Sequence, residues 1–150
     1  MMDVSVEDRL LIQELSARYA FLVDTKRYAE APALFAEDGT WDETVLGIPR
    51  CESREQIAAF FPLMSSTDLE FMIHINANHQ IVEYDGNSAR GTVHLHVAGR
   101  MNGKDMTIYG YYDDTYIKTD GRWWFHSRRL VAITAPQGDF GVDAAAAAAG

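Results

Sequence analysis

Four of the five histidines lie close together near the middle of the sequence, in a stretch that alternates apolar and polar residues around an Asp-Gly-Asn turn at positions 85–87. They are His74, His79, His94 and His96. The alternation predicts two β-strands joined by the turn. A neutral imidazole can remove a proton near neutral pH, and a neighbouring carboxylate fixes its tautomer and stabilises the imidazolium that forms. We therefore expect any chemistry to centre on one of these histidines.

Asp24 is the carboxylate that stands out as a partner for a histidine. It follows the apolar run Phe21-Leu22-Val23 and is expected at the C-terminal end of a helix. A polar residue that simply ends a helix is one interpretation. Negative charge is unfavourable at a helix C-terminus, however, and this mild conflict favours a second use. A histidine beside this carboxylate would be the simplest general base that needs no cofactor.

Other chemistries have weaker support in the sequence. His94 and His96 share one face of a predicted strand and could supply half of a metal site, but a third ligand would be needed. The sequence contains no HExxH, CxxC, Walker or GxGxxG motif, and Ser127 lacks a GxSxG context. We therefore predict no nucleotide cofactor, no metal and no serine nucleophile. Cys51 is the only cysteine, has no motif around it, and is expected to be inert.

The elements that must position these residues begin with helices. Ser5 can cap a first helix that runs to about residue 24, since acidic residues in the first turn suit the helix dipole. A second helix is expected over residues 28–36. A third is expected over residues 54–61, where a capping-box spacing begins at Ser53.

In the second half of the chain, apolar and polar residues alternate with the two-residue period of β-strands. Asp-Gly and Asn-Gly turn signals divide it into four long strands, expected at residues 71–84, 89–100, 105–118 and 122–134. A short strand over residues 40–45 would place Trp41, Glu43 and Val45 on one face. Helices followed by a strand meander predict an α+β fold, in which about three helices pack on the concave face of a curved antiparallel sheet.

Length and composition limit the range of functions. The 150 residues suit a single domain over residues 1–135, followed by a loosely held, alanine-rich tail over residues 136–150. A net charge of −9 argues against nucleic acid or an anionic membrane as a partner. The N-terminus lacks the pattern of a signal peptide, and no apolar run approaches the roughly 20 residues of a membrane span. A cytoplasmic protein is the simplest expectation.

The layout of these elements resembles the SnoaL-like branch of the nuclear transport factor 2-like superfamily, a group of cone-shaped α+β proteins, over residues 5–135. The closest pattern is that of scytalone dehydratase, γ-hexachlorocyclohexane dehydrochlorinase and bile acid 7α-dehydratase. The resemblance is carried by Asp24, in the sequence YAFLVD, and by His74, in the sequence MIH. It implies that His74 and Asp24 form a catalytic dyad, with Arg128 and Tyr19 as further catalytic residues.

Two of these assignments leave alternatives open. Tyr19 and Asp24 are five residues apart on a helix and point ~140° apart, so Tyr19 could equally be an ordinary core residue. In the second long strand, the positions of Val97 and Gly99 are apolar or empty where the dehydratases place a polar pocket residue. In that register Val97 faces the pocket, and His94 and His96 face away from it.

The resemblance implies a cofactor-independent lyase or isomerase that acts on a hydrophobic cyclic molecule. The alternatives are a polyketide-cyclase-type enzyme, a non-catalytic domain that binds a hydrophobic ligand, and a domain that mediates assembly. A homodimer or homotrimer is expected, because a long exposed sheet face would otherwise form a sizeable patch. Strand parity places Trp124, His126 and Arg128 on one face of the last strand. The residues expected to line an apolar pocket are Phe21, Phe35, Trp41, Phe60, Met72, Val97 and Trp124.

Overall fold

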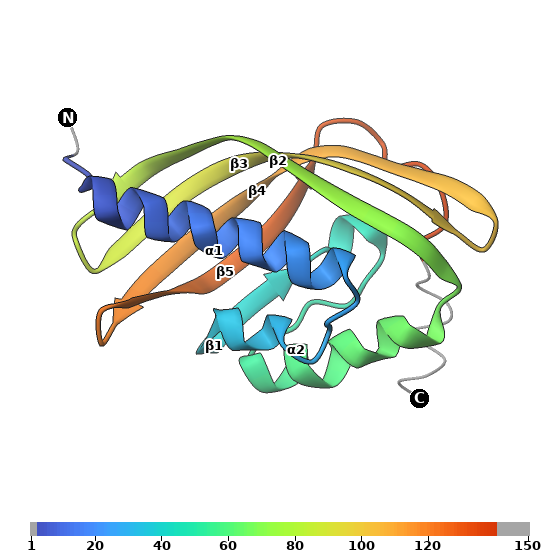
Figure 1. Ribbon diagram of the computed structural model, residues 1–150, viewed down its shortest axis with the longest axis horizontal. Coiled ribbons are helices and arrows are strands. Elements are labelled where there is room, and N and C mark those ends of the chain that lie inside the picture. Colours follow the sequence, from blue (N-terminus) through green and yellow to red (C-terminus); the bar gives the residue numbers. More distant parts are fainter. Residues whose placement is uncertain (1–2, 141–150) are drawn as a thin grey trace.

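The computed structural model describes residues 3–140, in which one long helix lies across the concave face of a curved five-stranded sheet (Figure 1). The strand order is β1-β5-β4-β3-β2, so β1 and β2 are free edges and the sheet is not closed. The strands are β1 (Phe35–Asp42), β2 (Leu69–Tyr84), β3 (Ser88–Met101), β4 (Lys104–Thr119) and β5 (Arg122–Ala132). Strands β2 to β5 form an antiparallel meander, whereas β1 pairs with β5 in parallel. The α+β prediction is confirmed, but the sheet is mixed rather than wholly antiparallel.

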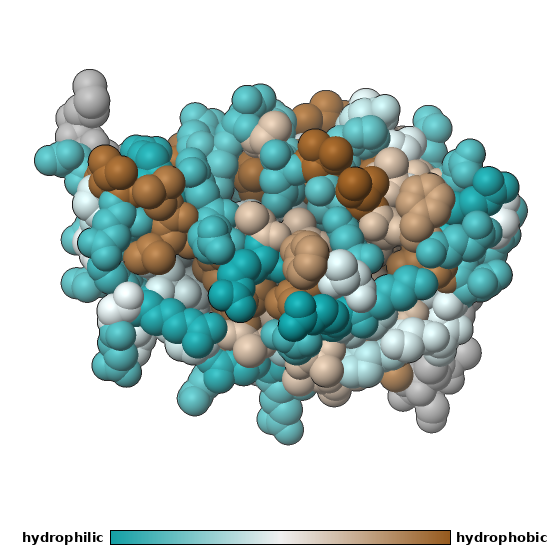
Figure 2. Space-filling model, in the orientation of Figure 1, coloured by the Kyte–Doolittle hydropathy of each residue, from teal (hydrophilic) through white to brown (hydrophobic). Residues whose placement is uncertain are grey.

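Helix α1 (Val6–Asp24) has the predicted bounds and the predicted cap. The hydroxyl of Ser5 accepts a hydrogen bond from the backbone N–H of Asp8 at 3.1 Å, which satisfies one of the free donors of the first turn. One side of the helix is buried against β2 and β5, and the opposite side faces solvent. Figure 2 shows apolar side chains gathered near its N-terminal end, where Val6, Leu10 and Leu11 are exposed.

Residues 3–140 contain two α-helices rather than the three predicted. The expected helix over residues 28–36 is only a four-residue 3₁₀ turn, Ala31–Leu34, and β1 begins immediately after it. The cause is a contact between residues far apart in the sequence. Phe35 pairs with Phe125 of β5 and is completely buried, so pairing with the sheet outweighs the local helical pattern. For the same reason the expected short strand lies earlier in the chain and ends at Asp42.

Helix α2 (Arg54–Phe60) confirms the last predicted helix, and it packs against β1. Ser53 caps it by accepting a hydrogen bond from the backbone N–H of Gln56 at 3.2 Å. A 3₁₀ segment, Phe61–Ser66, continues from the helix toward the start of β2. In Figure 1, α2 lies at the bottom centre and the 3₁₀ segment runs from it to the lower right.

The four long strands agree with the sequence prediction to within two residues at each end. Two of the hairpin turns use consecutive positive φ angles, at Asn102 (52°) and Gly103 (72°) and at Asp120 (53°) and Gly121 (74°). This is the backbone twist that favours Asn-Gly and Asp-Gly in two-residue hairpins. Residues 141–150 of the expected tail lie outside the described part of the chain. Among residues 3–140, no helix is both long and apolar enough to cross a bilayer.

Candidate active site

His74 and Asp24 are joined by two hydrogen bonds. Asp24 Oδ1 lies 2.5 Å from His74 Nδ1, and Asp24 Oδ2 accepts the backbone N–H of His74 at 2.8 Å. An ionised carboxylate can only accept, so Nδ1 carries the proton and Nε2 is the basic nitrogen. The side chains of His74 and Asp24 are 5% and 17% exposed, respectively. Asp24 thus holds the imidazole of His74 in one tautomer. Its second hydrogen bond, from the backbone N–H of His74, keeps the carboxylate in place.

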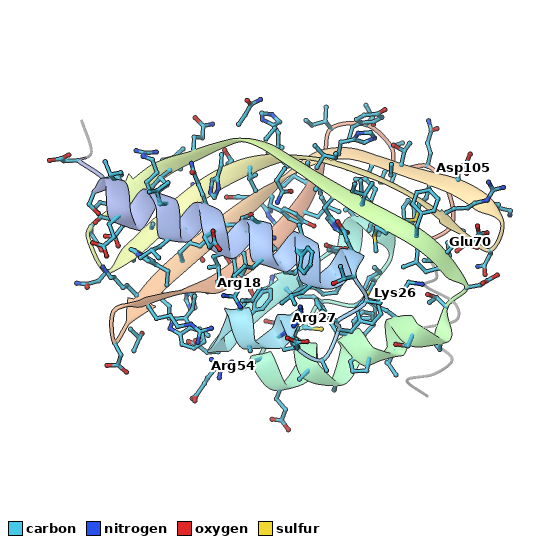
Figure 3. The ribbon with its side chains drawn as sticks, in the orientation of Figure 1. Arg18, Lys26, Arg27, Arg54, Glu70 and Asp105 are labelled. Carbon is cyan, nitrogen blue, oxygen red and sulfur yellow. The ribbon has the colours of Figure 1, made fainter. Side chains whose placement is uncertain are left out.

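The two residues meet because the C-terminal end of α1 lies against β2. His74 sits opposite Val97 of β3, and alternation along β2 directs it to the concave face while Ile73 and Ile75 point outward. Lys26, just beyond α1, donates to the carbonyl oxygen of Leu69 at 2.6 Å and so ties the helix end to the start of β2 (Figure 3).

His74 opens into an apolar cavity on the concave side of the sheet. All the space not filled by atoms in and around this cavity, including the open solvent at its mouth, amounts to about 550 Å³. Of the residues expected to line a pocket, Trp41, Met72 and Val97 line this cavity, and Tyr19 lines it as well. Further apolar walls come from α1, from the 3₁₀ segment after α2 and from β3 to β5, and include Val23, Phe61, Leu95, Met106, Ile108 and Leu130. Such walls suit a hydrophobic ligand oriented by a few polar groups.

Glu43 is the polar group of the cavity that sequence reasoning missed. It is the only carboxylic acid among the described residues that line the space, and it accepts a hydrogen bond from the hydroxyl of Tyr112 at 3.3 Å. Burial raises the pKa of Glu43 to about 6, while electrostatic interactions with His74 and Arg128 act to lower it. The alternation that put Glu43 on the same face as Trp41 was the one available signal, and it gave no hint of burial.

Tyr19 belongs both to the core and to the cavity wall. Its hydroxyl accepts a hydrogen bond from the indole N–H of Trp41 at 2.9 Å, and burial raises the pKa of Tyr19 well above its usual value. The phenol therefore stays protonated at every working pH. Its aromatic ring packs edge-on against that of His74, with centroids 6.3 Å apart, so Tyr19 supports the imidazole as well as lining the cavity.

Arg128 does not reach the cavity, contrary to the expectation that it would stabilise a leaving group. Its guanidinium is fully buried and forms a bidentate ion pair with Asp114, with N–O distances of 3.0 and 2.8 Å. It also donates to Ser16 at 2.7 Å and lies over the rings of Tyr112 at 3.9 Å and Tyr19 at 4.5 Å. Burial acts to lower the pKa of Arg128, but the charge of Asp114 outweighs it and the pKa rises. Arg128 therefore supports the aromatic wall from behind.

Four of the expected pocket residues do not line the cavity. Phe21 lies on the outer side of α1 and is 58% exposed, and Phe35 is packed in the core beside Phe125. Phe60 packs on the outer side of Trp41, while the next residue in the chain, Phe61, lines the cavity.

Trp124 points away from the cavity because β5 contains a register shift opposite Thr115 and Tyr116. Before the shift, Trp123 and Phe125 face inward, and after it Arg128 does. The predicted parity that grouped Trp124 with Arg128 is therefore wrong. Trp124 instead stacks with the guanidinium of Arg122, 3.7 Å from the ring centroid.

The remaining histidines of the central stretch are separate from the cavity. His96 stacks on Tyr109 on the convex face, with ring centroids 4.6 Å apart, and His94 packs edge-on against Tyr111. A register shift in β2 turns His79 inward, where its Nε2 lies 3.2 Å from the hydroxyl of Tyr116 and burial lowers its pKa. Within the described chain, no three His, Cys, Asp or Glu side chains are grouped so that they could hold a metal ion.

A curved open sheet over one long helix, enclosing an apolar cavity, is the architecture of the nuclear transport factor 2-like superfamily. Within it, the sequence profile of the SnoaL-like domain matches residues 4–129. This match covers most of the sequence, and the protein therefore belongs to the SnoaL-like family.

Solved structures of several proteins share this fold. A proposed aromatic ring hydroxylase from Novosphingobium aromaticivorans superposes with a TM-score of 0.86 at 24% identity, over 95% of this chain and 99% of its own. A proposed scytalone dehydratase from the same species reaches 0.77 at 22% identity, over 89% and 91%. A type 2 hexachlorocyclohexane dehydrochlorinase also reaches 0.77, at 18% identity, over 90% and 92%. At these identities the likeness shows the fold alone. No curated protein matches the sequence.

Proposed function

We propose that this protein is a cofactor-independent lyase or isomerase that acts on a hydrophobic cyclic small molecule. The observation that carries the proposal is the His74–Asp24 pair. Asp24 binds Nδ1 of the imidazole, which leaves Nε2 as the basic nitrogen, and His74 lines an apolar cavity. In the reaction, His74 removes a proton from carbon while Asp24 keeps Nδ1 protonated and stabilises the imidazolium. Two of the similar structures bear the names of a dehydratase and a dehydrochlorinase, and both names describe eliminations.

Substrates that fit this chemistry are ring compounds with a hydroxyl or halide on the carbon next to an acidic C–H. The apolar walls would hold the ring, and the hydroxyl of Tyr19 would donate to a carbonyl oxygen and stabilise the developing enolate. A panel of such compounds, with hydroxyl and halide members of each pair, should include at least one that the wild-type protein converts.

The decisive variant is His74→Ala. It is expected to abolish turnover of the converted compound while the thermal unfolding transition remains cooperative. His96→Ala on the convex face removes an imidazole that does not line the cavity, and is the matched control. Undiminished activity of His74→Ala would refute the mechanism. If ring compounds bind equally to both proteins and none is converted, the cavity serves ligand binding without catalysis.

A further inference from the structure

Glu43 faces the same cavity as His74 but is held by a different part of the chain. Trp41, near the end of β1, exchanges two backbone hydrogen bonds with Cys51, at 3.0 and 2.9 Å, which closes the loop between them. Glu43 follows Trp41 by two residues and therefore points to the same inner side. Leu46 and Ile48 of this loop also line the cavity, so the acid is presented from an apolar wall.

The carboxyl group has few partners in this position. Its one hydrogen bond within the described protein comes from Tyr112, which leaves the second oxygen without a partner. Its pKa of about 6 means that about half of the molecules carry the proton at pH 6 and about a tenth at pH 7. A protonated carboxyl group in an apolar site is a good hydrogen-bond and proton donor, and catalytic acids work best when their pKa lies near the working pH.

The cavity also lacks what a departing halide would need. No Lys or Arg is among the described residues that line it, and Arg128 is paired with Asp114 behind the tyrosines. A halide leaves as a stable anion and requires no proton, and an ionised Glu43 would repel it. A hydroxyl group, by contrast, leaves readily only when it is protonated as it departs.

We propose that Glu43 is the general acid that protonates a departing hydroxyl group, so that the elimination performed at this site is a dehydration. This inference rests on the proposed function of His74. His74 takes the proton from carbon, the C–H electron pair forms the carbon–carbon double bond, and the C–O bond breaks. The oxygen receives the proton of Glu43 and leaves as water. The imidazolium then returns a proton to Glu43 through solvent, so the net products are the alkene and one water.

The test uses Glu43→Gln, which keeps the size of the side chain but cannot deliver a proton. The matched probes are 3-hydroxy-5-phenylcyclohexanone and 3-chloro-5-phenylcyclohexanone, which give the same enone. The variant is expected to eliminate water ~10²–10⁴-fold more slowly than wild type, and to change chloride elimination less than tenfold. In the wild type, water elimination should decline as the pH rises above about 6, and the variant should lose that decline. Glu52→Gln, an exposed acid just after this loop, is the control.

A third probe separates the two proposals. 3-Phenylcyclohexanone has no leaving group, so exchange of its α-protons in D₂O reports the action of His74 alone. Exchange that persists in Glu43→Gln while water elimination is lost supports the role of Glu43. That role is overturned if Glu43→Gln slows water and chloride elimination equally, or if it eliminates water at the wild-type rate. Absence of exchange and of elimination in the wild type would overturn the proposed function itself.

Discussion

Replacing Glu43 by Gln should make the protein more stable at neutral pH, because the native fold holds this carboxyl group where ionisation is unfavourable. The pKa of Glu43 rises from 4.5 to about 6 on burial. A group with a raised pKa keeps its proton longer in the folded state than in the unfolded state. Folding stability is therefore lost as the pH rises from about 4.5 through about 6, and the penalty is complete above that range.

The size of this effect follows from the same shift. One pKa unit corresponds to about 1.4 kcal/mol, so the penalty of an ionised Glu43 is about 2 kcal/mol. We take this as an upper value, since Glu43 as a whole residue is only half-buried and solvent reaches part of it. Gln keeps the ability to accept from Tyr112 and never ionises, so the variant should not show this decline.

The assay is urea unfolding of the wild type and the variant at intervals between pH 4 and pH 8. The difference in unfolding free energy should be small near pH 4 and should grow in favour of the variant up to pH 7. Glu52→Gln, whose side chain is exposed and paired with Arg50, is the control for removal of one surface charge. A difference between Glu43→Gln and wild type that stays constant across this range would refute the reasoning about burial.

Three other outcomes follow from the structure. Arg128→Met leaves the carboxylate of Asp114 buried and uncompensated, and is expected to lower the unfolding free energy by about 3–5 kcal/mol in urea titrations; the double variant with Asp114→Leu should recover much of this loss. Asp8 accepts three side-chain hydrogen bonds, which outweigh the effect of burial and lower its pKa. The contribution of Asp8 to the unfolding free energy is therefore present above about pH 4 and is lost as the pH falls further. Asp8→Asn should make the unfolding free energy, measured in urea titrations, depend less on pH in acid. Ile75 is half exposed on the convex face, and if two copies pair through that face, Ile75→Asp should reduce the mass measured by light scattering, whereas an unchanged mass would argue against this interface.

Local patterns in the sequence sufficed for the elements whose contacts are close in the chain. Asn-Gly and Asp-Gly turns fixed the hairpins between the long strands, and Ser5 and Ser53 marked the starts of both α-helices. β1 was found only in part: the strand predicted over residues 40–45 overlaps its end, but its start is set by pairing with β5, which lies about 90 residues later in the chain.

The site was predictable to a similar extent. The His74–Asp24 pair came from a family resemblance together with strand parity, and the structure brings the two side chains together. Parity failed for Trp124, since an irregularity inside a strand reverses which side chains face inward and leaves no clear mark in the sequence. The role of Glu43 was hidden because its raised pKa depends on apolar residues from several distant segments that enclose it.

The acid and the base of the proposed reaction are also coupled through their charges. A positive charge on His74 acts to lower the pKa of Glu43, and this effect opposes that of burial. When His74 takes a proton from the substrate, Glu43 therefore becomes a stronger acid at the moment when the departing oxygen needs its proton. The same apolar walls that make ionised Glu43 unfavourable in the resting protein also strengthen this interaction, because charges attract more strongly where water is excluded. A cavity with His74 alone would remove a proton equally well but would leave the hydroxyl group to depart without assistance.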